Sequence, residues 1–156
     1  MDTKYIEPFV DATIKIFEEF YSEIPEVRTP FLFERNKDLG WGLSAVIGIA
    51  GETKGVITIS FPEEMIIKLT EKLVGYAISE INDDVIDSAG EVVNIIAGNA
   101  KKGLEQFRLV ISLPSIIRGE KHMISWPTGN IPIITIPFVV SLGTFHVSVG
   151  LENIIK

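Results

Sequence analysis

Residues 82–107 read NDDVIDSAGEVVNIIAGNAKKGLEQF, and this stretch predicts one long helix that organises the chain. The Asn82-Asp83-Asp84 cluster suits a helix N-terminus, because short polar and acidic side chains stabilise the free N–H groups there. The apolar residues that follow recur at helical spacing, so one face of the helix is expected to pack on a core. That face is formed by Ile86, Ala89, Val93, Ile96, Ala97, Ala100 and Leu104.

The opposite face of the predicted helix carries a polar stripe. Asp87, Glu91 and Asn94 are spaced i, i+4 and i+7, which places them on one side of a helix. A solvated surface is the simplest interpretation of such a stripe. A functional surface is favoured by Asn94, which has poor helix propensity, and by Gly98, which costs about 1 kcal/mol relative to alanine. Ile95 is expected to be partly exposed beside the stripe, which suits a contact surface.

Working outward, the flanking sequence predicts two further helices and two hairpins. Turn residues separate the paired β-branched runs, and prolines open the helices. The expected elements are a helix over 7–22, a hairpin of 41–50 and 56–61, a helix over 62–75, a strand over 109–113, a less regular stretch through Trp126, and a hairpin of 131–140 and 144–151.

This order predicts a single α+β domain over residues 1–156, with a largely antiparallel sheet packed against long helices. Each half leads from a helix into paired strands, which indicates a degenerate internal duplication, although nothing repeats residue by residue. Pro132 and Pro137 suggest that the second hairpin includes an edge strand. Its few charges and many β-branched residues would leave that edge open to pairing with another chain.

Composition narrows the classes of function. The 156 residues carry a formal charge of −7, so nucleic acid and anionic membrane surfaces are poor partners. Cysteine is missing from the sequence, which excludes disulfides and thiolate chemistry. The first nine residues have no apolar signal core and no apolar run is long enough to span a bilayer, so a cytoplasmic protein is expected.

Other candidate motifs are weaker. Residues 40–45 match GxGxxA, but a strand follows, whereas a dinucleotide fingerprint must open a helix. Residues 98–103 have glycines at P-loop spacing without the following Lys-Ser/Thr. His122 and His146 lack the spacing of metal ligands, and His146 is interpreted as a hydrogen-bonded sheet residue. No metal site is predicted.

The polar stripe resembles a known signature. Asp87-x-x-x-Glu91-x-x-Asn94, with Pro114 20 residues after Asn94, is similar to the signature of the CheC/CheX/FliY chemotaxis phosphatases. Residues 6–13, IEPFVDAT, and 94–101, NIIAGNAK, look like the CheX branch of that family. The proline lies closer to the asparagine than in the CheC branch. The first helix has no second acid–Glu–Asn stripe, so the chain resembles a one-site member.

The resemblance implies a CheC-like fold and a hydrolase that removes the aspartyl phosphate of a CheY-like receiver domain in two-component chemotaxis signalling. It implies that Asn94 positions the hydrolytic water and that Glu91 docks to a receiver lysine. Asp87, Ile95 and Gly98 would contact the receiver. The resemblance further implies a homodimer formed through the sheet and no cofactor on this chain, with magnesium held by the receiver.

Two alternatives stay open at this point. A flagellar-switch-like docking module would bind a receiver without hydrolysing its phosphate, and it would not need the Glu91–Asn94 pair. A small-molecule sensor is less favoured, because no convergent polar pocket can be recognised in the sequence.

Overall fold

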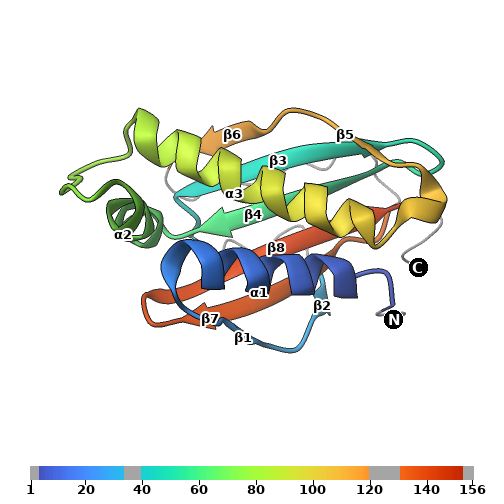
Figure 1. Cartoon of the computed structure of the whole chain (residues 1–156), viewed down its shortest axis with the longest axis horizontal. Coiled ribbons are helices and arrows are strands. Elements are labelled where there is room, and N and C mark those ends of the chain that lie inside the picture. The colour runs from blue at the N-terminus through green and yellow to red at the C-terminus, as the bar shows by residue number, and fades with distance from the viewer. Residues whose placement is uncertain (1–3, 34–39, 120–130, 153–156) are drawn as a thin grey trace.

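The computed structural model describes residues 4–33, 40–119 and 131–152. The described residues form three α-helices, a short 3-10 turn and eight strands, which gives the expected α+β class (Figure 1). The helices are α1 (Glu7–Tyr21), α2 (Glu63–Val74) and α3 (Asp83–Lys102), and the turn is Glu105–Phe107. The strands are β1 (Glu26–Val27), β2 (Phe31–Leu32), β3 (Leu43–Ala50), β4 (Gly55–Phe61), β5 (Val110–Ile111), β6 (Ser115–Arg118), β7 (Ile134–Val140) and β8 (Gly143–Leu151).

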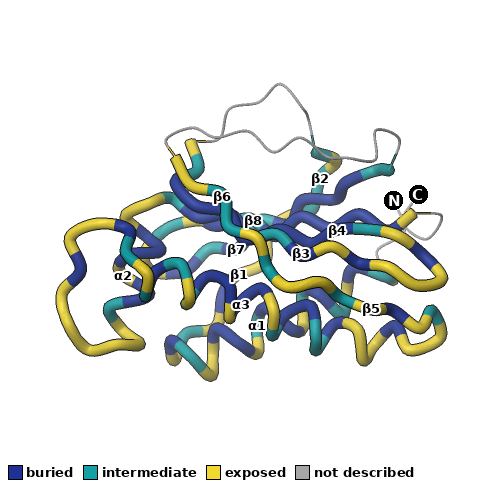
Figure 2. The backbone as a smooth tube through the Cα atoms, turned by 90° about the horizontal axis from the view of Figure 1, so that it is seen from above, coloured by how far each residue is buried: buried dark blue, intermediate teal, exposed yellow. Residues whose placement is uncertain are grey.

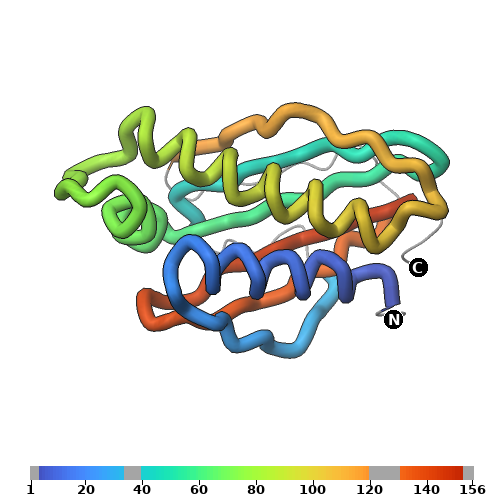
Figure 3. The backbone as a smooth tube through the Cα atoms, viewed as in Figure 1, coloured from blue at the N-terminus to red at the C-terminus, as the bar shows by residue number. Residues whose placement is uncertain are grey.

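The strands form one antiparallel sheet in the order β1-β7-β8-β4-β3-β5, with β2 also paired to β7 and β6 to β3. Helices α1 and α3 lie side by side across one face of this sheet (Figures 1 and 3). Seen at right angles, both helices lie on the same side of the strands (Figure 2). No helix in the described part of the chain has the length and apolar character needed to cross a bilayer.

Aromatic stacking joins α1 to the sheet. The ring of Phe17, from α1, stacks on Phe145 of β8 at 4.4 Å between centroids, and Phe138 of β7 stacks on Phe145 at 5.2 Å. All three side chains are fully buried. Stacked aromatic pairs add about 0.5–1.5 kcal/mol beyond the burial of their area, so this cluster fixes α1 on the sheet beside α3.

Helix α3 begins where the sequence predicts it. The Asn82 side chain accepts a hydrogen bond of 3.0 Å from the backbone N–H of Val85, which caps the first turn. Acidic Asp83 and Asp84 occupy that turn and the basic pair 101–102 ends the helix, so both ends complement the helix dipole. The helix stops before the predicted 107, and Gly103 lies against Pro8 of α1.

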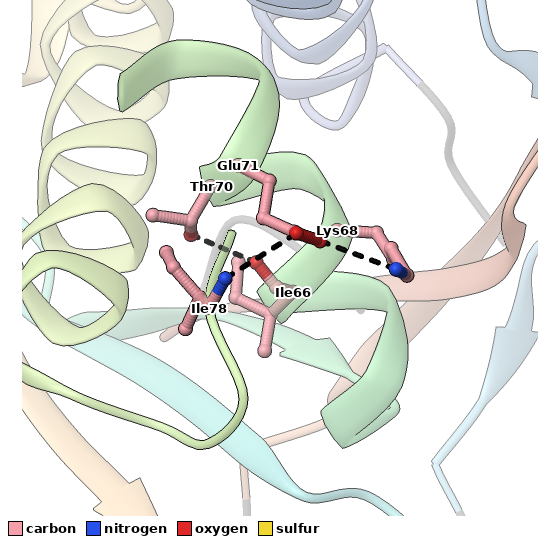
Figure 4. Close-up of polar contacts among 5 residues, drawn as sticks. All are labelled: Ile66, Lys68, Thr70, Glu71 and Ile78. Carbon is pink, nitrogen blue, oxygen red and sulfur yellow. Dashed lines mark hydrogen bonds and ion pairs between the residues drawn. The ribbon is translucent and has the colours of Figure 1, made fainter. Parts of the chain in front are cut away.

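Side-chain contacts also fix the connection from α2 to α3. Glu71 accepts a 3.3 Å hydrogen bond from the Ile78 backbone N–H and pairs with Lys68 at 3.2 Å (Figure 4). The Tyr76 hydroxyl donates a hydrogen bond to Asp84 in the first turn of α3. These contacts hold the residues that lead into the helix carrying the polar stripe.

The second hairpin is not at an edge, so that prediction is wrong. Strand β8 pairs with β4, and β7 is covered on its outer side by β1 and β2. The Pro137 carbonyl accepts a 2.9 Å hydrogen bond from the Arg28 N–H, so the missing N–H of Pro137 faces the same side. Pro137 lies between the residues of β7 that pair with β1 and those that pair with β2, so its missing N–H interrupts neither ladder.

The other sheet edge also differs from the prediction. The strand expected over 109–113 is reduced to β5, and β6 lies within the stretch predicted to be less regular. Both edges are therefore built of two short strands. Helix, split edge strand and hairpin recur in each half, with each edge strand paired to the hairpin of the other half. The internal duplication itself stays a prediction, because the order of elements does not establish common descent.

Candidate functional site

The polar stripe of α3 lies where the sequence predicts it. Asp87, Glu91 and Asn94 are exposed, whereas Val93 and Ala97 on the opposite face are buried in the core. In the described part of the chain, the side chains of Asp87, Glu91 and Asn94 form neither hydrogen bonds nor ion pairs. Two carboxylates and a carboxamide are therefore available to another molecule.

The stripe forms one wall of an open hollow of about 430 Å³. The other wall is formed by the chain between β5 and β6 and by the start of β6, and of this wall the sequence indicated only Pro114. The hollow is lined by Ile86, Asp87, Gly90, Glu91, Asn94, Leu113, Pro114 and Ile116. Charged and amide groups on one side thus face aliphatic side chains on the other.

Pro114 packs directly on the helix. A Cβ atom placed on Gly90 would lie 3.4 Å from Pro114 Cγ, at about van der Waals contact. Pro114 therefore lies against α3 at Gly90, beside Glu91. The proline that the resemblance singled out by its distance along the sequence is thus adjacent to the stripe in space, and Gly90 is a site residue that the sequence interpretation missed.

Ile95 and Gly98, the other two predicted contact residues, do not line this hollow. Ile95 is half-buried and packs against the core. Gly98 is half-buried, and a Cβ atom there would meet nothing within 4 Å, so packing within the chain does not require glycine. Gly98 lines a second hollow of about 300 Å³ further along α3, with Lys101, Lys102 and Arg108.

Among the described residues, His146 does not line this hollow. His146 lies on β8, where its ring contacts Trp41 at 4.7 Å and Phe31 at 5.8 Å between centroids. Its buried Nδ1 has no hydrogen-bond partner among the described residues, contrary to the expectation of a hydrogen-bonded sheet histidine. Burial lowers the pKa of His146 to about 4, so the ring is neutral at physiological pH. His122 and Trp126 lie outside the described residues.

Within residues 4–33, 40–119 and 131–152, the structure contains no cluster of three His, Cys, Asp or Glu side chains able to hold a metal ion. The GxGxxA match is not a nucleotide site, because β3 follows it where a helix is required. The chemistry that the hollow offers is hydrogen bonding and charge at a surface open to a macromolecule.

Solved structures place this fold in the CheC-like superfamily. A CheC-like superfamily protein from Shewanella sp. PV-4 matches with a TM-score of 0.88 and 26% identity, over 98% of this chain and 100% of that one. A putative chemotaxis protein from Desulfovibrio vulgaris Hildenborough is 34% identical, with a TM-score of 0.85 over 96% of this chain and 97% of that one. No curated protein gives a match.

The model of the family described as chemotaxis phosphatase CheX matches residues 43–139. The chain belongs to the CheX family of chemotaxis phosphatases. The CheX of Borrelia burgdorferi, solved in complex with CheY, BeF3 and Mg²⁺, is 27% identical, with a TM-score of 0.81 over 96% of this chain and 98% of that one.

Proposed function

We propose that this protein hydrolyses the aspartyl phosphate of a CheY-like receiver domain. The observation that carries the proposal is the exposed Glu91–Asn94 pair, which has no side-chain partner among the described residues and borders an open hollow in a chain of the chemotaxis phosphatase family. The complex of the Borrelia relative with CheY supports a receiver as the partner.

Asn94 positions the hydrolytic water in this proposal. Its carboxamide oxygen accepts a hydrogen bond from the water, while its amide nitrogen donates to a phosphoryl oxygen. The water attacks phosphorus in line, the acyl P–O bond breaks, and the receiver aspartate leaves as a carboxylate. Because the acyl phosphate is already reactive, positioning is the main contribution required. A neutral side chain provides it without repelling the phosphoryl group.

Glu91 sets the docking geometry by pairing with a receiver lysine near the phosphoryl group. Asp87, one turn earlier on the same exposed face, is a supporting contact. Gly98 and the exposed part of Ile95 extend the docking surface along α3. The magnesium ion that neutralises the phosphoryl oxygens belongs to the receiver, and this chain contributes no cofactor. Each protomer of a proposed homodimer carries one such site.

The decisive experiment is the lifetime of a phosphorylated CheY receiver with and without this protein. The wild type should shorten that lifetime, and Asn94→Ala should abolish the effect while melting like the wild type, because an exposed truncation alters stability little. Asn99→Ala, on the same helix but off the stripe, is the matched control and should stay active. Undiminished dephosphorylation by a folded Asn94→Ala protein would rule out the mechanism. Binding without hydrolysis by the wild type would favour the docking module instead.

A further inference from the structure

The edge strand beside the hollow is interrupted at residues 112–114. On one side of the break Ile111 pairs with Ile49, and on the other Ser115 pairs with Val46. Two residues of β3 therefore face three residues of the edge, which defines a β-bulge. Pro114, which cannot donate to a ladder, occupies this bulge. Bulges of this kind redirect a side chain away from the regular alternation of the strand.

Ser112 stabilises the bulge through hydrogen bonds of its backbone N–H and of its hydroxyl group. Its N–H donates to the Gly48 carbonyl at 2.9 Å, as in a regular antiparallel pair. The Gly48 N–H, which would otherwise pair with a carbonyl, donates to Ser112 Oγ at 2.9 Å. Ser112 Oγ in turn donates to the Leu113 carbonyl at 2.9 Å. One hydroxyl thus replaces the ladder bond lost at the bulge and fixes the peptide that carries Leu113.

Leu113 is directed into solvent by this arrangement. With 86% of its surface exposed, it is the most exposed large apolar side chain that the structure describes. Between β5 and β6, Ser112 and Leu113 are exposed and Pro114 is half-buried, and the tube there is largely yellow in Figure 2. Leu113 also lines the hollow opposite Glu91 and Asn94. A single exposed leucine is common on protein surfaces, so the position of Leu113 carries the argument: it lies on the wall of the hollow opposite the polar stripe, where a partner that reaches the stripe would bury it.

We propose that Leu113 is an apolar anchor for the phosphorylated receiver domain and that Ser112 is the residue that positions it. This inference rests on the proposed function, which supplies the occupant. A folded partner whose phosphoryl group reaches Asn94 must cover the opposite wall of the same hollow, where Leu113 stands. Burial of the leucine then strengthens binding, whereas Glu91 and Asn94 determine orientation and chemistry.

The anchor is tested by separating binding from chemistry. With phosphorylated CheY receiver from the same organism as substrate, Leu113→Ala should raise KM about tenfold and leave kcat within about twofold of the wild type. The Kd for the receiver loaded with BeF3⁻ and Mg²⁺ should rise by the same factor. Leu142→Ala is the matched control, because it removes the same atoms from an exposed leucine in the turn between β7 and β8, outside the hollow.

Ser112 variants test the positioning role. Ser112→Ala should raise KM and Kd in the same direction as Leu113→Ala, and Ser112→Thr, which keeps the hydroxyl, should restore both. A loss of stability in Ser112→Ala that leaves KM unchanged would overturn the role of Ser112.

The binding and lifetime measurements distinguish a failure of this inference from a failure of the proposed function. Wild-type affinity in folded Leu113→Ala would overturn the anchor while leaving the phosphatase intact. A wild type that binds the receiver through Leu113 without shortening the phosphate lifetime would overturn the phosphatase while keeping the anchor. A wild type that does not bind the BeF3⁻-loaded receiver would overturn both.

Discussion

At the scale of single residues, charge and hydrogen-bonding capacity separate the roles on α3. Glu91 is exposed and has no ion-pair partner among the described residues, so its charge is free for a receiver lysine. Glu91→Lys should weaken binding of a BeF3⁻-loaded receiver at least about tenfold, because like charges then meet at the interface. Glu91→Gln should lose less affinity for the loaded receiver than Glu91→Lys.

The control for Glu91→Lys is Glu64→Lys on α2, which changes the net charge equally from an exposed position outside the hollow. Equal affinity of Glu91→Lys and the wild type for the loaded receiver would count against the docking role. A similar loss in Glu64→Lys would assign the effect to the overall charge of the protein.

His146 provides a residue-scale prediction about pH. Burial lowers its pKa to about 4 in the folded protein, while an unfolded histidine titrates near its ordinary value of about 6.5. Between these two values the unfolded chain binds more protons, so the free energy of unfolding falls as the pH drops from about 6.5 to 4. His146→Phe keeps an aromatic ring between Trp41 and Phe31 and removes the titration.

The measurement is the urea midpoint of the wild type and His146→Phe at pH 7 and pH 5. The wild type should lose more stability than the variant, by about 1 kcal/mol, since partial exposure of the ring reduces the effect. Carboxylates titrate in both proteins and cancel in the comparison. An equal loss in both proteins would show that His146 does not titrate abnormally.

At the scale of elements, the helices and both hairpins could be predicted because each carries its own periodicity. The phase of α3 follows from its 3.6-residue pattern, and Val93 is fully buried while Asn94 is exposed, as that pattern requires. The two-residue strands β1 and β2 have no such pattern. They form because β7 offers an unpaired edge, which is a tertiary effect.

The site was predicted only in part for the same reason. The stripe is local in sequence, so Asp87, Glu91 and Asn94 could be assigned to one face from their spacing. The opposite wall depends on the register between β3 and β6 and on the bulge beside it. Register is set by pairing across the sheet. The contact between Pro114 and Gly90 and the exposure of Leu113 therefore could not be derived from the sequence.

At the scale of the whole molecule, the two edges of the sheet differ in whether a second copy could bind there without covering the hollow. The edge formed by β5 and β6 borders the hollow, and a partner paired there would crowd Leu113 and Glu91. The edge formed by β1 and β2 lies at the other end of the sheet. Apolar side chains are exposed on and near it, with Ile24 at 67%, Leu32 at 55% and Val27 at 37%. This edge is therefore the better surface for self-association.

We expect a two-fold dimer through the β1–β2 edge, because an apolar and uncovered edge favours association with a second copy. Sedimentation at micromolar concentration should give twice the mass of the chain. Val27→Lys combined with Leu32→Lys should give monomers that keep their phosphatase activity per site, since each α3 face is complete within one chain. Glu64→Lys, which adds a lysine elsewhere on the surface, should stay dimeric. A wild-type monomer would refute the assembly, and a dimer whose interface buries Glu91 and Asn94 would refute the proposed chemistry as well.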